Sequence, residues 1–164
     1  MLRLSELATA AKNDPEGTRQ LLTVPALVAE SAALGTLTPD WELTAKVKEK
    51  VAALSTDPVI HFLRKVPNTG NAFTQGITLG RLVSNDIPVE DNRISRFHAW
   101  FQKDERLDEW ALTDAESRNG TWLEERKLAP AKREVLTNLA RLRFGHVEFR
   151  FLLPTTLQAL IATP

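Results

Sequence analysis

The stretch SRFHAWF, residues 95–101, has apolar residues at alternate positions, with Phe97, Ala99 and Phe101 expected on one face. The stretch HVEFRF, residues 146–151, repeats this period of two near the end of the chain. Successive side chains of a β-strand point to opposite faces of a sheet. Both stretches therefore predict half-buried strands.

Further strand and turn signals surround these two stretches. Residues 59–66 are apolar and rich in β-branched residues, and the turn cluster PNTGN follows at 67–71. Leu123 and Leu128 flank a short charged turn. Many short strands separated by turn signals indicate a mainly β protein with a sandwich or barrel.

The first 57 residues follow a different, helical pattern. Apolar residues recur at helical spacing from Leu4 to Ala11, and the sequence Asn13-Asp14-Pro15 ends that stripe and can begin a second helix. Residues 25–34 and 39–54 predict two more helices, the latter with an N-terminal Thr-Pro signal. We therefore expect a helical N-terminal extension over 1–57, which is too small to be stable unless it packs on another element.

The overall composition excludes several classes of protein. The chain has 164 residues, of which 43% are hydrophobic, and it has no cysteine. Disulfides, thiol nucleophiles and cysteine-based zinc sites are therefore excluded. Lys+Arg and Asp+Glu both total 21, so the net charge is zero, which argues against a general nucleic-acid binder. No stretch approaches the ~20 apolar residues of a membrane span, and we expect a soluble, cytoplasmic protein.

Arginine and other hydrogen-bond donors occur where predicted strands end. Arg81 follows Gly80, the pair Ser95-Arg96 precedes a strand, and the pair Arg118-Asn119 lies in a turn closed by Gly120. A rigid sandwich commonly uses such loop ends for binding. Arginine can donate two parallel hydrogen bonds to an oxyanion. These residues are therefore candidates for an anion-binding site.

Four short stretches in one order resemble the forkhead-associated (FHA) domain. They are LGR at 79–81, SRFHA at 95–99, DAESRNGTW at 114–122 and RFG at 143–145. The resemblance implies an antiparallel β-sandwich of about 11 strands over residues 58–154 that binds phosphothreonine peptides. Residues 1–57 would then be a helical extension, and residues 155–164 a short tail or helix.

The resemblance also implies a role for individual residues. The residues expected to bind the phosphothreonine and the adjacent main chain are Arg81, Ser95, Arg96, Arg118 and Asn119. Both the hydroxyl and the backbone of Ser95 are expected to donate to the phosphate. Arg93 occupies the position that reads the third residue after the phosphothreonine, which suggests an acidic or polar preference there. The residues expected to brace the loops are Gly80, His98, Ser117, Gly120 and Thr121.

Two positions depart from the family pattern. Glu124-Glu125 replaces a common Asn-Gly turn, and Leu139-Ala140 replaces a common Gly-Asp pair. Both turns lie away from the expected phosphate site, so the departures concern loop geometry more than binding.

The expected function is recognition of a partner phosphorylated on threonine, such as a Ser/Thr kinase or its substrate. No nucleophile–His–acid set or glycine-rich phosphate loop indicates an enzyme, and no cofactor or metal is predicted. His61 and His146 are expected at most to form a cross-strand pair. Two alternatives remain: a phosphate-independent scaffold that docks through the N-terminal helices, and a reader inhibited by its own phosphorylated Thr36 or Thr38.

Overall fold

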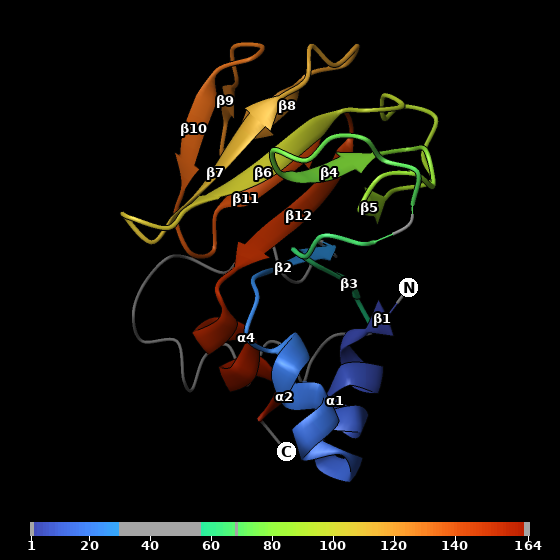
Figure 1. Ribbon diagram of the computed structural model, residues 1–164, viewed down its shortest axis with the longest axis vertical. Helices are drawn as coiled ribbons and strands as arrows, with labels where there is room; N and C mark the ends of the chain where they lie inside the picture. The colour runs from blue at the N-terminus through green and yellow to red at the C-terminus, as the bar shows by residue number, and fades with distance from the viewer. Residues whose placement is uncertain (1, 30–56, 68, 163–164) are drawn as a thin grey trace.

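Two β-sheets pack face to face in the computed structural model, which describes residues 2–29, 57–67 and 69–162 (Figure 1). The larger sheet has the order β1 (Leu2–Arg3), β3 (Val59–Phe62), β2 (Ala26–Ala29), β12 (Val147–Leu152), β11 (Arg141–Phe144), β8 (Thr121–Leu123) and β9 (Arg126–Lys127). The smaller sheet has the order β10 (Arg133–Leu136), β7 (Glu109–Asp114), β6 (Ala99–Asp104), β4 (Ile77–Gly80) and β5 (Ile87–Pro88). Only β4 and β5, among the described strand pairs, run parallel. The predicted β-sandwich is confirmed, with 12 described strands.

Aromatic side chains fill the space between the sheets. Phe101 of β6 lies 6.2 Å from Phe144 of β11, and Phe144 lies 6.0 Å from Phe149 of β12, measured between ring centroids. The alternation predicted for residues 146–151 is confirmed where Phe149 and Phe151 enter this core. Phe97 was expected on the same face as Phe101, but it precedes β6 and its side chain is 37% exposed.

Strand β2 corrects one of the predicted helices. Residues 26–29 lie between β3 and β12 and are hydrogen-bonded to both. Leu27 enters the sandwich core, whereas Ala26 and Val28 face the opposite side of the sheet. A short apolar run has no period that separates strand from helix, so the long-range pairing decided its conformation. The remainder of that prediction, 30–34, and the helix predicted over 39–54 lie outside the described residues.

The three helices of the described residues cover the outer face of the larger sheet at one end of the molecule (Figure 1). They are α1 (Leu4–Asn13), α2 (Pro15–Leu21) and α4 (Pro154–Ile161). The helix predicted from Leu4 is confirmed, and the Asp14 carboxylate accepts a hydrogen bond of 2.9 Å from the Gly17 N–H at the start of α2. Residues 155–164 were expected to form a short tail or helix, and helix α4 lies there. None of the described helices is long and apolar enough to cross a membrane.

The helices and the larger sheet share a second apolar core. Leu4 and Leu7 of α1 and Leu157 of α4 pack there with Val28 of β2 and Ile60 of β3. Strands β1 and β2 belong to the sheet and pair with β3. A domain boundary at residue 57 would therefore separate strands that are hydrogen-bonded to each other. The N-terminal helices thus pack on the sandwich, as their small size required.

The histidine pair considered from the sequence does not form. Strand β2 separates β3, which carries His61, from β12, which follows His146. The ring of His61 instead makes an edge contact with Phe149 at 5.9 Å, and burial lowers the pKa of His61 to about 4. No group of three potential metal ligands occurs in the described parts of the chain.

Candidate functional site

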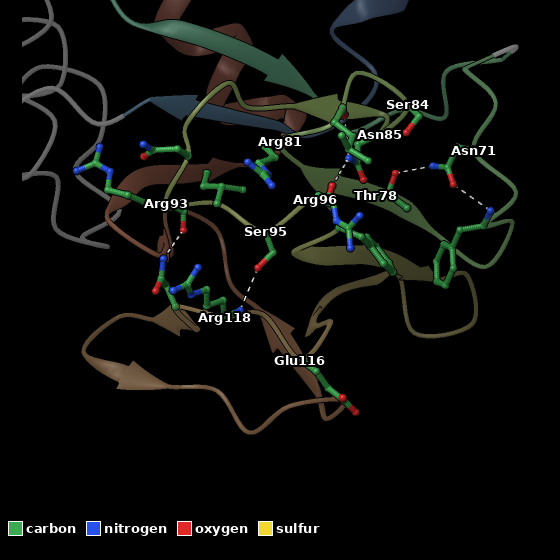
Figure 2. Close-up of a pocket in the computed structure, with 16 residues that line it drawn as sticks. Asn71, Thr78, Arg81, Ser84, Asn85, Arg93, Ser95, Arg96, Glu116 and Arg118 are labelled. Atoms are coloured by element: carbon green, nitrogen blue, oxygen red, sulfur yellow. Dashed lines mark hydrogen bonds between the residues drawn. The ribbon is translucent and has the colours of Figure 1, made fainter.

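A hollow of about 790 Å³ lies at the loop end of the sandwich, where β4 ends and β6 begins. Its walls come from segments 71–85, 92–97 and 116–119. Figure 2 shows Arg81, Ser95, Arg96 and Arg118 around this hollow. Thus the sequence stretches that carried the expected binding residues meet at one place.

Gly80 allows two segments to approach closely beside the hollow. A Cβ atom at this position would overlap the carbonyl oxygen of Arg96. The neighbouring Arg81 N–H donates to the Ser95 carbonyl at 3.0 Å, and the His98 N–H donates to the Leu79 carbonyl at 2.8 Å. The expected bracing role of Gly80 therefore rests on this close approach, which no residue with a Cβ atom would allow.

His98 connects two of the loops that form the hollow. Its side chain is fully buried, and its Nδ1 atom accepts a hydrogen bond of 3.0 Å from the Ser95 N–H. Its Nε2 atom lies 3.1 Å from the Gly120 carbonyl oxygen, so this nitrogen carries the proton. Burial lowers the pKa of His98, opposed by the Gly120 carbonyl and the charge of Asp114, and the neutral ring is favoured.

The contacts of Ser95 correct half of its expected role. Its backbone N–H is already used by His98, so the expected donation from this N–H to a phosphate does not fit the geometry. The Ser95 Oγ atom accepts a hydrogen bond of 3.0 Å from the Arg118 N–H. Because a hydroxyl can accept and donate at once, the Ser95 proton can still be directed at a ligand.

The buried carboxylate of Asp114 fixes the turn that carries Arg118. Asp114 accepts hydrogen bonds from the Ser117 N–H at 3.0 Å, the Ser117 hydroxyl at 2.6 Å and the Thr121 hydroxyl at 2.5 Å. No role of Asp114 was predicted from the sequence. An aspartate that begins a turn and is followed by serine is a signal that could have identified it.

Asn119 links this turn to the loop that precedes Ser95. Its amide Nδ2 atom donates to the Arg93 carbonyl at 2.6 Å. Gly145 approaches the same Arg93 carbonyl, and its φ angle of +61° favours glycine. The expected contact between Asn119 and the peptide main chain stays a prediction.

Three arginines supply positive charge to the hollow. Arg81, Arg96 and Arg118 are exposed, and no ion pair joins them to an acidic side chain in the described segments. Glu116 also lies on the wall, but Figure 2 shows its side chain directed away from Ser95. A chain with no net charge therefore carries a local basic site.

Arg93 differs from the other arginines of the hollow because it has an acidic partner. Its Nε and Nη2 atoms donate to the two carboxylate oxygens of Asp91 at 2.9 and 2.6 Å. These bonds lower the pKa of Asp91 to about 2. The pair leaves less net positive charge for an acidic peptide residue than the sequence suggested.

The remaining wall was not predicted from the sequence. Asn85 donates from Nδ2 to the carbonyls of Leu82 at 2.9 Å and Arg96 at 2.7 Å, and so holds these two strand ends together. Asp86 is buried beneath the wall and binds Lys65 at 2.8 Å. Burial alone would raise the pKa of Asp86, but hydrogen bonds from Lys65 and backbone N–H groups lower it overall. The contacts of Asn85 with Arg96 and of Asp86 with Lys65 join residues 11 and 21 positions apart, so no local pattern indicates them.

The comparison with known families agrees with this architecture. Residues 77–145 match the family model of the FHA domain. These residues form an FHA domain. The match includes every residue of the expected site and ends at Gly145, which contacts the Arg93 loop. No curated protein matches the chain at a significant level.

Solved structures show the same fold at low sequence identity. Mycobacterium tuberculosis EmbR in complex with a low affinity phosphopeptide is 17% identical, with a TM-score of 0.53 over 88% of this chain and 31% of that chain. Full-length yeast Pml1p is 17% identical, with a TM-score of 0.52 over 79% of this chain and 81% of that one. A structure from an analysis of phosphothreonine-dependent FHA domain interactions is 18% identical, with a TM-score of 0.50 over 80% and 97% of the two chains. The present chain spans about a third of the EmbR chain that it resembles.

Proposed function

We propose that this FHA domain binds phosphothreonine peptides in the hollow and recognises proteins phosphorylated by Ser/Thr kinases. The observation that carries the proposal is the convergence of Arg81, Arg96, Arg118 and the Ser95 hydroxyl on one hollow. The proposed role is that of a recognition module and not of an enzyme. The phosphopeptide bound to EmbR, which shares the fold, supports the same use of the sandwich.

The charge of a phosphate matches this arrangement. A phosphorylated threonine carries nearly two negative charges and three acceptor oxygens at neutral pH. Each hydrogen bond to a charged group contributes about 1.5–3 kcal/mol. Three such bonds could therefore contribute much of the ~8 kcal/mol that corresponds to a micromolar complex.

A preference for threonine over serine needs a further contact. The threonine methyl group contributes about 0.8 kcal/mol when it is buried, which is roughly a fourfold preference. Ile94 is buried and belongs to the wall of the hollow, next to Ser95. We propose that this side chain contacts the threonine methyl.

The structure limits the two alternative functions. The apolar faces of α1 and α4 are buried against the larger sheet, so a scaffold function would need another surface of these helices. Thr36 and Thr38, proposed for self-inhibition, lie outside the described residues. No contact in the described segments favours either alternative over phosphopeptide binding.

The test compares matched peptides and matched arginine variants. A library of phosphothreonine peptides with varied flanking residues first identifies a sequence that binds. Purified protein is then titrated with that sequence in its phosphothreonine, phosphoserine and unphosphorylated forms. Arg81→Ala should lower phosphopeptide affinity at least tenfold, the equivalent of one charged hydrogen bond. Arg106→Ala changes an exposed arginine outside the hollow and should bind as the parent does. Failure of the folded parent to bind any phosphopeptide would contradict the proposal.

A further inference from the structure

Three aromatic rings form a cluster at one side of the hollow. Phe73 lies 5.4 Å from Phe97 and 5.4 Å from Trp100, and Phe97 lies 5.9 Å from Trp100, measured between ring centroids. Phe73 and Phe97 line the hollow together with Leu82. We call Phe73, Leu82 and Phe97 the apolar wall. Leu82 and Phe97 directly follow the basic residues Arg81 and Arg96 in the sequence.

The apolar wall presents surface that could be buried by a ligand. Phe97 is 37% exposed and Leu82 is 45% exposed, although both are large apolar residues. Neighbouring exposed apolar side chains beside a polar rim commonly mark a binding groove. Here they share one hollow with the arginines, so a ligand that reaches Arg96 also lies close to Phe97.

The position of Phe73 is fixed by polar contacts. Its N–H donates to the Asn71 side chain at 3.0 Å, and its carbonyl accepts from the Lys65 ammonium at 2.6 Å. Lys65 in turn binds the buried Asp86 at 2.8 Å, and Asn71 donates to the Thr78 hydroxyl at 2.6 Å. Phe73 is therefore held in place before a ligand arrives. Preformed sites lose less entropy on binding.

Phe73 lies outside the segment that matches the family model. That segment begins at Ile77, four residues later. The loop between β3 and β4 thus contributes Phe73 to the apolar wall, whereas Leu82 and Phe97 lie inside the matched segment.

The wall and Arg93 lie at opposite sides of the site. Figure 2 shows Arg93 on one side of Ser95 and Asn71, which is hydrogen-bonded to Phe73, on the other. Arg93 is expected to face residues that follow the phosphothreonine. An extended peptide with its phosphate near Ser95 then directs the residues before the phosphothreonine toward the apolar wall.

We propose that the apolar wall selects phosphothreonine peptides with a large apolar residue among the three positions before the phosphothreonine. This inference rests on the proposed function and names its ligand class. An extended chain rises about 3.3 Å per residue, so three residues span roughly 10 Å, which suits contact within a single hollow. Burial of a leucine or phenylalanine side chain against the wall should increase affinity about tenfold over serine.

The experiment measures binding of paired phosphothreonine peptides by titration calorimetry or fluorescence anisotropy. One set carries leucine or phenylalanine before the phosphothreonine, a second carries the same residue after it, and a third carries serine at all these positions. Phe97→Ser should abolish the roughly tenfold preference for the first set and leave affinity for the third set unchanged. Leu107→Ser removes an apolar residue that is 64% exposed outside the hollow, and it should keep the preference.

The outcomes separate this inference from the proposed function. Equal binding of all three phosphopeptide sets, or a preference only for the second set, would overturn the apolar wall as a specificity site while phosphopeptide binding stands. No binding of any phosphopeptide would overturn both. Thermal denaturation checks that Phe97→Ser is folded, and Leu82→Ser provides a second variant on the same wall. A preference that persists in both variants also overturns the inference.

Discussion

The loop end of the sandwich and the helix-covered face of the larger sheet are built from different interactions. At the loop end, hydrogen bonds from His98, Asp114 and Asn119 join turns that carry exposed arginines. On the helix-covered face, apolar side chains such as Leu7 and Leu157 are fully buried and dominate the contact. The first region keeps charge available to a ligand, whereas the second removes apolar surface from water.

This difference means that stability and binding should respond to different substitutions. Figure 1 places α1, α2 and α4 at the end of the molecule away from β4 and β5. Sites that share no contacts usually have additive effects. A substitution in one region should therefore leave the property of the other region largely intact.

The largest effect is expected from Leu7→Ala on the helix-covered face. Leu7 is fully buried, so the substitution leaves a cavity and should lower the free energy of unfolding by about 2–5 kcal/mol. Phosphopeptide affinity of the folded fraction should not change. Denaturant unfolding and peptide titration measure the two properties, with Lys12→Ala on the exposed side of α1 as the control. A parallel loss of affinity would show that the two regions are coupled.

His98→Ala should affect both properties, because His98 is a buried residue of the binding region. The substitution leaves the Ser95 N–H without its partner and removes one of two hydrogen bonds to the Gly120 carbonyl, which keeps the Gly145 N–H. The cost in unfolding free energy should be about 2 kcal/mol. Affinity should also fall, because the Ser95 and Arg118 loops lose a shared anchor. His146→Ala, at an exposed position, should change neither property. Unchanged affinity in folded His98→Ala would show that the histidine does not support the binding loops.

Arg118→Ala should lower affinity without a loss of stability. The Arg118 side chain is exposed, and its backbone N–H to Ser95 remains after the substitution. We expect phosphopeptide affinity to fall about tenfold if the guanidinium reaches the phosphate. Arg133→Ala, an exposed arginine on β10, is the matched control in the same titration. Equal affinities for both variants would show that the Arg118 side chain does not bind the phosphate and that only its backbone N–H contributes to the site.

The smallest effect is expected from mild acidification. The pKa values of His61 and His98 are lowered by burial from the ordinary value of 6.5, to about 4 for His61. Below pH 6.5 these histidines therefore bind more protons in the unfolded chain than in the folded protein. The free energy of unfolding falls as the pH is lowered from 6.5 toward their folded pKa values. The melting temperature should fall by a few degrees between pH 7.5 and pH 5.0. His61→Gln should reduce this fall, and an unchanged pH dependence would contradict the assignment to His61.

Local sequence patterns were sufficient for several elements of the fold. The stripe from Leu4 and the Asp14-Pro15 signal predicted α1 and the start of α2, because helix periods and caps depend on neighbouring residues. Alternation along residues 146–151 predicted most of β12 for the same reason. The segment at residues 26–29 could not be predicted this way, since it became a strand only by pairing with β3 and β12.

By itself, the sequence determined which residues meet in the FHA domain, because four ordered stretches carry Arg81, Ser95, Arg118 and Gly145. Only the tertiary structure decided how their hydrogen bonds are distributed. It assigned the Ser95 N–H to His98 and brought Phe73 beside Phe97, 24 positions further along the chain (97 − 73). Such contacts join segments distant in sequence, and their geometry depends on the packed sheets rather than on any local pattern.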